Sequence, residues 1–173
     1  MDLPLERHVS RNRREPAALK VAIRPAVAAD LDALVALEHA AFATDRAERR
    51  AIRHAIRSPS MTLLAALAQD GGEDILVGAA TLERRSTSLV ARLSSIAVAP
   101  ARAGHGLGSL LLDAAEADTV GHGRTRLRLE VRADNGAGIR LYERRGYVRI
   151  GTKPDYYEDG MEAWCYEKAL ALA

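Results

Sequence analysis

Short apolar runs alternate with longer helical patterns along this chain, and this alternation constrains its fold more than any other feature. The predicted strands span residues 21–24, 61–68, 75–83, 93–99, 126–132, 147–152 and 162–169, and the predicted helices span residues 30–41, 46–57, 107–120 and 136–145. Strands interspersed with helices are typical of an α/β domain whose helices cover the faces of one sheet. The order therefore predicts a mixed sheet with helices on its faces.

The run 126–132 shows the strand pattern most clearly, because apolar and charged residues alternate in it without exception. The apolar members are Leu127, Leu129 and Val131, and the charged members are Arg128, Glu130 and Arg132. Successive side chains of a strand point to opposite faces of the sheet. Only the apolar face of this strand can enter a core.

Local signals mark where several elements begin and end. Asp30 and Asn135 are predicted to cap the helices that follow them. Gly146 stands where a residue in the left-handed conformation would end the second of these helices. The turn-forming stretch 69–73 joins two strand-like runs, which predicts a β-hairpin.

Chain length favours a single folded unit. A chain of 173 residues buries enough surface to fold without disulfides or metals, and its one cysteine, Cys165, has no internal partner. Residues 1–19 are rich in arginine and lack apolar periodicity, so we expect a flexible basic arm there. We expect residues 20–173 to form one domain.

Composition also limits location and partners. The first residues lack an apolar signal sequence, and no run approaches the length of a membrane span. We therefore expect a cytoplasmic protein without a membrane partner. The formal net charge is only +2, so we expect no nucleic-acid partner.

Three glycines at alternate positions, 104, 106 and 108, lie between the strand 93–99 and the helix 107–120. Glycine lets backbone approach a phosphate closely, and the free N–H groups of a helix start favour an anion. The P-loop lysine is missing, and Ser109 stands where the dinucleotide fingerprint needs its last glycine. The residues alone leave two alternatives, a diphosphate cradle and a simple glycine-rich turn.

Two side chains have chemical capacity but an ambiguous setting. Tyr142 follows Asn135 by seven residues, so both lie on one helix face, where a tyrosine usually packs into a core. Glu130 stands between Arg128 and Arg132, a pattern typical of a solvated or ion-paired strand face. Such neighbours would lower the pKa of Glu130, which keeps it ionised but weakens it as a base.

Four strings in a fixed order connect these features. They are Ile96–Pro100 (IAVAP), Gly104–Gly108 (GHGLG), Leu129–Asn135 (LEVRADN) and Leu141–Tyr147 (LYERRGY). Together they resemble the GNAT superfamily of acetyl-CoA-dependent N-acetyltransferases, over roughly residues 21–169. LEVRADN, LYERRGY and the later YYEDG are most similar to the bacterial ribosomal-protein alanine N-acetyltransferase group, whose members acetylate a protein N-terminus.

The resemblance implies the GNAT fold, a mixed and mostly antiparallel sheet of about six to seven strands with helices on both faces and a splayed central pair of parallel strands. It also implies acetyl-CoA as cosubstrate and no metal. The implied cofactor-binding residues are Ile96, Ala97, Val98, Gly104, His105, Gly106, Leu107, Gly108, Ser109 and Asn135. Ala103 stands where the family often has arginine or glutamine, so we expect little contribution from Arg102.

The resemblance also implies the catalytic roles. Tyr142 would be the general acid that protonates the departing thiolate, and Glu130 would be the general base. Tyr156 and Tyr157, in the loop 153–160, would contact the acceptor, because the family closes this segment over it. Carboxylates of the same loop are within reach of an ammonium group.

The predicted reaction is transfer of an acetyl group from acetyl-CoA to a primary amine, and we expect the amine to be a protein N-terminus. About a tenth of α-amines but fewer than about one in a thousand lysines are neutral at pH 7, so an α-amine asks less of the base. Two alternatives stay open, a small-molecule amine as acceptor and a module that binds acetyl-CoA without turnover. The presence of Tyr142 argues against the second, and a homodimer is left open.

Overall fold

The computed structural model describes residues 20–171 as seven strands and four α-helices. The strands are β1 (Val21–Pro25), β2 (Met61–Asp70), β3 (Glu73–Arg84), β4 (Val90–Val98), β5 (Arg126–Arg132), β6 (Val148–Lys153) and β7 (Ala163–Ala169). The helices are α1 (Leu31–Ala41), α2 (Arg49–Arg57), α3 (Leu107–Gly121) and α4 (Gly136–Arg144). The basic arm predicted for residues 1–19 lies outside the described residues.

All seven strands form one sheet in the order β1-β2-β3-β4-β5-β7-β6. Only the neighbours β4 and β5 are parallel, and every other pair is antiparallel. The predicted mixed, mostly antiparallel sheet is confirmed. The predicted hairpin is formed by β2 and β3, and Asp70 and Glu73 are the last paired residues before its turn.

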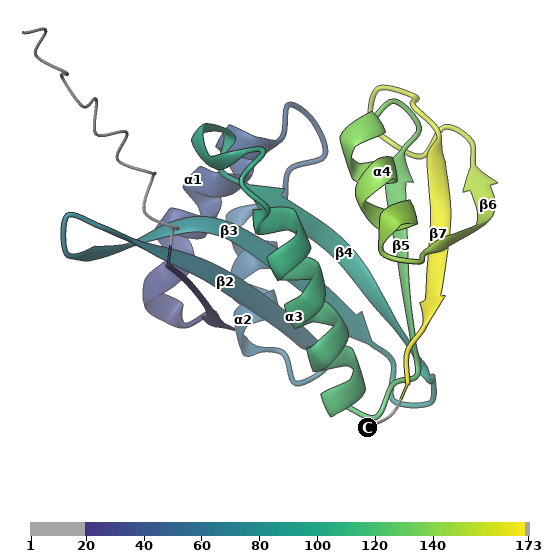
Figure 1. The fold of residues 1–173 in the computed structure, drawn as a ribbon, viewed down its shortest axis with the longest axis horizontal. Coiled ribbons are helices and arrows are strands. Elements are labelled where there is room, and N and C mark those ends of the chain that lie inside the picture. The colour runs from purple at the N-terminus through teal and green to yellow at the C-terminus, as the bar shows by residue number, and fades with distance from the viewer. Residues whose placement is uncertain (1–19, 172–173) are drawn as a thin grey trace, which may run out of the picture.

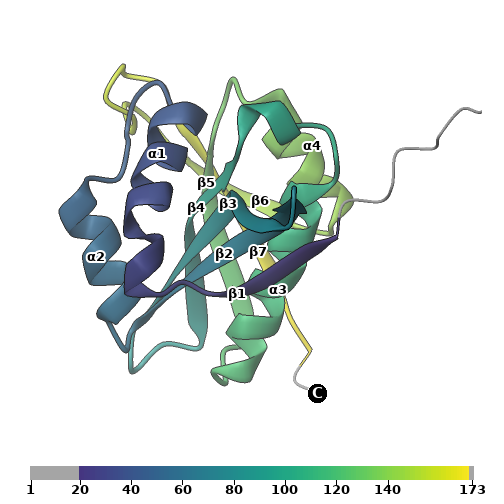
Figure 2. The ribbon, with the colours of Figure 1, turned by 90° about the vertical axis from the view of Figure 1, so that its left-hand side faces the viewer.

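Helices cover both faces of this sheet. Figures 1 and 2 show α1 and α2 on one face and α3 and α4 on the other. The alternation in β5 explains how one strand serves both layers, because its apolar side chains are at most 3% exposed and pack in one core with Leu111 of α3. A second core under α1 and α2 includes Leu34, Leu37 and Ile52. The charged face of β5 thus lies on the side of α1 and α2.

The parallel strands β4 and β5 separate along their length. They pair only between Val90–Leu93 and Arg126–Leu129, so residues 94–98 of β4 have no strand partner on that side. The predicted splay is therefore confirmed. An extended ligand could hydrogen-bond to the backbone of this uncovered strand edge.

One of the two predicted helix caps is confirmed, and the other is wrong. Asn135 caps α4 as predicted, because its Oδ1 accepts the Gly138 N–H at 2.9 Å, and Gly146 has the predicted left-handed φ of +85°. Asp30 precedes α1, but the prediction that its side chain caps that helix is wrong. Its carboxylate accepts the Val27 N–H at 2.8 Å and pairs with Arg24 at 2.7 Å. A guanidinium is a stronger partner for a carboxylate than a helical N–H.

Two predicted elements differ from the observed ones by three residues at their start, the largest differences in the chain's described elements. The strand expected at 93–99 begins earlier, at Val90, and the helix expected at 46–57 begins later, at Arg49. In residues 20–171, no helix combines the length and apolar character that crossing a membrane requires.

Candidate active site

The gap between β4 and β5 opens into a cavity of about 730 Å³. Ser94, Ser95 and Ile96 line it from the uncovered part of β4, and Tyr142 lines it from α4. The opposite wall comes from α1, α2 and the loop between them. One cavity thus contains both the uncovered edge of β4 and the predicted catalytic residues Glu130 and Tyr142.

The glycine loop turns the chain from β4 into α3. Gly104 and Gly106 have φ values of +77° and +78°, a conformation that L side chains rarely adopt. Gly106 occupies the N-cap position of α3, and no side chain caps the helix there. The first N–H groups of α3 are therefore left for an anion, as the cradle alternative requires.

His105, at the tip of this loop, faces its own backbone. Its ring Nδ1 lies 2.9 Å from the carbonyl oxygen of Ala103 and 3.2 Å from that of Arg102, so an N–H there donates to the loop. Arg102 lies 3.5 Å from Asp70 in the neighbouring hairpin. Both contacts leave the backbone as the main feature of the loop that could hold a ligand.

Tyr142 places a phenol in the cavity wall. Its ring is buried and packs edge-on against Tyr147, with centroids 5.8 Å apart. Burial, together with the nearby Tyr157 hydroxyl, raises the pKa of Tyr142 to about 12. The phenol therefore stays neutral at physiological pH and keeps a proton that it can donate. Asn135 lines the same cavity, as their shared helix face predicts.

Glu130 is held by two cations that are distant in sequence. Its Oε1 lies 2.6 Å from Lys153 Nζ and its Oε2 lies 2.9 Å from Arg92 Nε, and its side chain is only 6% exposed. Burial raises the pKa of Glu130, but the hydrogen bonds from Lys153 and Arg92 outweigh burial and hold the pKa below its ordinary value. The carboxylate is therefore ionised.

The predicted direction of this pKa shift is confirmed, and its predicted cause is wrong. Arg128 pairs with Glu167 at 2.6 Å, and Arg132 pairs with Asp159 at 2.7 Å. Sharing a strand face with Glu130 was not enough to bind it, because β7 and the loop after β6 bring carboxylates closer to both arginines.

A profile of the acetyltransferase (GNAT) family matches residues 30–147. This range begins just before α1 and includes β4, the glycine loop, Glu130 and Tyr142. The chain belongs to the GNAT family of acetyltransferases. This domain is therefore an acetyl-CoA-dependent N-acetyltransferase.

Several solved structures share this fold. The ribosomal-protein-S18-alanine N-acetyltransferase of Escherichia coli superposes with a TM-score of 0.76 at 26% identity, covering 89% of this chain and 96% of that one. Ard1 of Thermoplasma volcanium superposes with a TM-score of 0.77 at 25% identity, covering 87% and 98%. Nourseothricin acetyltransferase, at 22% identity and a TM-score of 0.71, shares the fold.

A curated relative shares only part of its length with this GNAT domain. An uncharacterized protein of Mycobacterium leprae is 41% identical over 86 residues, which are 49% of this chain and 23% of that protein. The matched segment thus spans about a quarter of the length of that relative.

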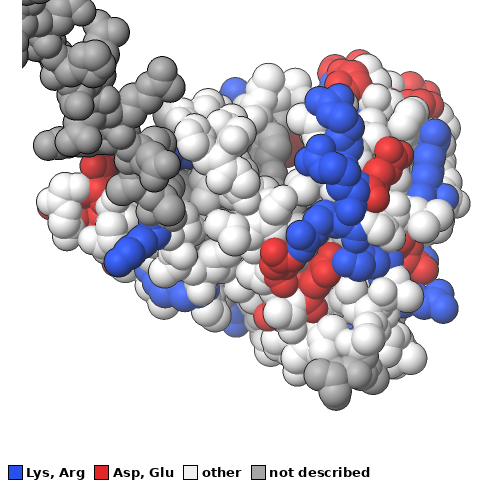
Figure 3. All heavy atoms as spheres, in the orientation of Figure 1, with Lys and Arg blue, Asp and Glu red and all other residues white. Residues whose placement is uncertain are grey.

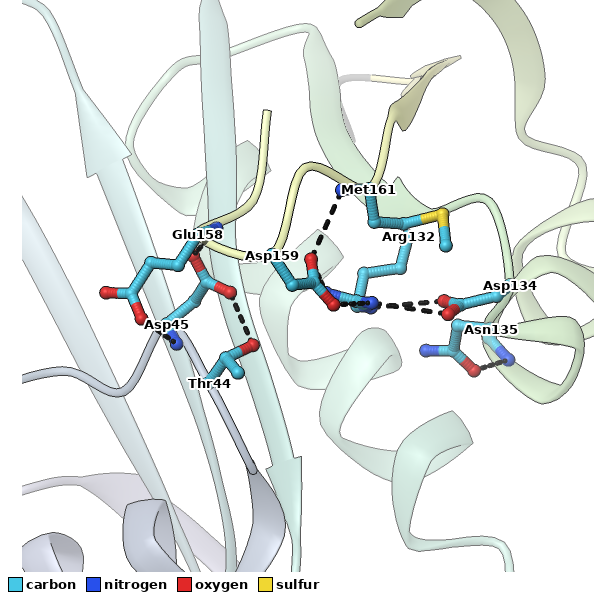
Figure 4. A network of polar contacts seen from close by, with 9 residues as sticks. Thr44, Asp45, Arg132, Asp134, Asn135, Glu158, Asp159 and Met161 are labelled. Atoms are coloured by element: carbon cyan, nitrogen blue, oxygen red, sulfur yellow. Dashed lines mark hydrogen bonds and ion pairs between the residues drawn. The ribbon is translucent and has the colours of Figure 1, made fainter. Parts of the chain in front are cut away.

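The loop between β6 and β7 is tied to the loop between α1 and α2. The Glu158 N–H donates to Asp45 Oδ1 at 3.0 Å, and the Asp45 N–H donates to Glu158 Oε2 at 3.4 Å. Figure 4 shows this reciprocal pair beside the one in which Asp159 binds Arg132. Two of the three loop carboxylates that the sequence offered to an ammonium group, Glu158 and Asp159, therefore already have protein partners.

The two adjacent tyrosines of this loop face different spaces. Tyr157 lines the cavity, and burial raises its pKa to about 12. Tyr156 lies outside that lining, and its hydroxyl accepts a hydrogen bond from Arg92 at 2.9 Å. The sequence analysis gave both tyrosines the same role, contact with the acceptor. In the structure their rings are almost perpendicular, at 86°.

Glu38 of α1 is a cavity residue that the sequence did not reveal. Six carboxylates line the cavity, and five of them are held by cations or by loop donors. Glu38 receives one hydrogen bond, from the Ala47 N–H to Oε2 at 3.0 Å, and no described cation pairs with it. Burial raises the pKa of Glu38. Its place at helical spacing between apolar residues was the only available signal.

We expect Gly106→Val to remove most of the affinity for acetyl-CoA. A β-branched residue at a φ of +78° costs about 1–3 kcal/mol of strain, which the loop relieves by moving. Calorimetric titration with acetyl-CoA measures the loss, and Arg102→Ala serves as the control with little expected change. The reverse ranking of the two variants would show that the loop does not hold the cofactor.

Proposed function

We propose that this enzyme acetylates the α-amine of a protein N-terminus. The observation that carries the proposal is the single cavity that brings Tyr142, Glu38 and Glu130 to the uncovered edge of β4. The likeness to an S18-alanine N-acetyltransferase over almost the whole of both chains supports the choice of acceptor.

The chain's own groups fit CoA. The uncapped N–H groups of residues 107–109 would bind its diphosphate, and the free backbone edge at Ile96, Ala97 and Val98 would pair with the amides of its pantetheine arm. Figure 3 shows Lys and Arg side chains over α4, on the sheet face that α3 and α4 cover. Their positive charge favours the binding of a polyanion such as CoA. When bound, acetyl-CoA supplies the acetyl group as an activated thioester.

Tyr142 would act as the acid. The amine nitrogen forms a bond to the acetyl carbon while the carbon–sulfur bond breaks, and Tyr142 gives its hydroxyl proton to the sulfur. The amide nitrogen sheds a proton at the same time, which restores the phenol. One further proton leaves the incoming ammonium group and needs a carboxylate.

Glu130 would be that carboxylate in the simplest scheme. Its ion pairs with Arg92 and Lys153 make it a weak base, which limits the enzyme to amines that lose a proton easily. An α-amine with a pKa near 8 meets this condition and a lysine near 10.4 does not. The contacts of Glu130 thus favour an N-terminal acceptor.

Glu38 competes with Glu130 for the same role. Its Oε1 accepts no hydrogen bond from any described residue, and its desolvated carboxylate has a raised pKa, so it takes up a proton more readily. Comparison of Glu38→Gln with Glu130→Gln on one peptide decides between them. The variant with the larger loss of kcat identifies the base.

The high pKa of Tyr142 has a measurable consequence. An acid works only while protonated, and with a pKa of about 12 the phenol stays protonated through pH 10. We therefore expect kcat to show no alkaline decline between pH 8 and about pH 10.5. A decline centred near pH 10, the ordinary pKa of a tyrosine, would contradict the assigned environment.

The acceptor class is tested by thiol release from acetyl-CoA with three kinds of amine. We expect turnover with a peptide that has a free, small N-terminal residue. The same peptide with a blocked N-terminus and an internal lysine should react poorly. Faster acetylation of spermidine or of free amino acids would favour a small-molecule acceptor instead.

A further inference from the structure

A second hollow of about 670 Å³ lies beside the cavity, on the sheet face that also carries α1 and α2. It is formed where β3 ends and β4 begins, along the charged face of β5, and at Lys153, the last residue of β6. Its lining is rich in charged groups. These are Glu83, Arg84, Arg85, Arg92, Arg128, Glu130 and Lys153.

The net charge of this hollow is positive. Arg84 is set aside, because its side chain is only 5% exposed and pairs with Asp118 of α3 at 3.1 Å. The remaining lining contains four cations and two carboxylates. The side chains of Arg92, Arg128 and Lys153 are 37%, 45% and 48% exposed, so they remain open to a ligand despite their ion pairs.

Arg85 adds a positive charge that no described residue pairs with. Its side chain is exposed, and its guanidinium has no hydrogen bond or ion pair to any residue in 20–171. Only its carbonyl oxygen is engaged, by the Ser88 N–H and by Arg124. An unpaired guanidinium at the rim of a positive hollow favours a carboxylate ligand.

The hollow adjoins the cavity. Met61, Glu83 and Glu130 line both spaces, so a chain that leaves the cavity past Glu130 enters the hollow. The bond between Asp45 and Glu158 ties the two loops over the cavity together, which restricts passage between those loops. The hollow therefore offers a lined space for residues that leave the cavity on this side.

We propose that the hollow binds the residues that follow the acceptor's N-terminus and selects acidic ones. This inference rests on the proposed function, because it assigns the reacting N-terminus to the cavity. Carboxylates of the acceptor would meet the guanidinium groups of Arg85 and Arg128 and the ammonium group of Lys153. An acceptor with basic residues at these positions would meet like charges.

The test compares three peptides with the same N-terminal Ala-Gly, followed by Asp-Glu-Asp, by Ser-Asn-Ser or by Lys-Arg-Lys. We expect kcat/KM to fall in that order, with at least a tenfold difference between the first and the last at low salt. Addition of about 0.5 M NaCl should reduce the difference in kcat/KM between the peptides. Salt screens the charges, because the Debye length falls from about 10 Å at 0.1 M to about 3 Å at 1 M. Equal kcat/KM for all three peptides, or a preference for the basic one, would overturn the proposal.

A pair of charge reversals locates the effect. We expect R85E combined with R128E to invert the order of the peptides while the KM for acetyl-CoA stays unchanged. The matched control is R50E combined with R53E, which makes the same change of charge on exposed positions of α2 outside both linings. If the order of the peptides in kcat/KM is unchanged in R85E/R128E, or is inverted equally in the control, the hollow does not select the acceptor.

A binding measurement separates this proposal from the proposed function. The N-acetylated form of the acidic peptide, labelled with a fluorophore, is titrated with the enzyme and with the R85E/R128E variant. Tighter binding to the unmodified enzyme, without turnover of any free peptide, would retain the hollow and reject the N-terminal acceptor. Equal binding to both proteins would reject the hollow, whatever the turnover.

Discussion

The Tyr142→Phe enzyme is expected to turn over at least about a hundredfold more slowly than the wild type, while it binds acetyl-CoA almost equally well. Loss of a general acid commonly costs this much, because the thiolate must then take its proton from water. The substitution keeps the ring, its burial and its edge-on contact with Tyr147. Stopped-flow or steady-state thiol release gives kcat, and calorimetry gives the affinity.

A matched control for this variant is Tyr147→Phe. Tyr147 lies beside Tyr142 in the same core, but its hydroxyl donates to Glu116 of α3 at 3.1 Å and does not line the cavity. We expect this variant to lose stability, by about 1 kcal/mol, and to keep kcat within a few fold. Equal losses of kcat in both variants would indicate a packing effect and would remove the catalytic assignment of Tyr142.

The Glu130→Gln enzyme is expected to lose activity in proportion to the basicity of its acceptor. With an α-amine peptide we expect a loss of about tenfold, and with a lysine peptide a loss of about a hundredfold or more. Gln cannot accept a proton, and an amine that is already partly neutral suffers less from this. Initial rates for both peptides at pH 7 measure the ratio.

The same substitution should also lower stability. Arg92 and Lys153 would lose their shared anion, at a cost of about 2 kcal/mol, less than for a fully buried pair because both cations are partly exposed. The stabilising effect of Glu130 requires its ionised form, so in the wild type it is lost as the pH falls through the lowered pKa. Urea unfolding at pH 7 and pH 3 checks both statements.

Equal activity losses for the two peptides would contradict the role of Glu130 as base.

Local physics made much of the fold readable from the sequence. The alternation in β5 placed Leu127, Leu129 and Val131 in the core, because the side-chain period of a strand is fixed by its backbone. Asn135 and Gly146 marked the ends of α4, because caps depend on neighbouring residues only. The glycine loop was recognisable for the same reason.

Tertiary structure alone decided which charges meet. Arg92 and Lys153 bind Glu130 although its sequence neighbours Arg128 and Arg132 are equally basic. Arg92 lies on β4, the neighbour of β5, and Lys153 lies at the end of β6 and reaches Glu130 across β7. Tyr156 and Tyr157 are adjacent in sequence, yet they serve different spaces. Glu38 entered the cavity wall through the packing of α1. A long-range contact depends on how whole elements are packed together, and no local pattern encodes that.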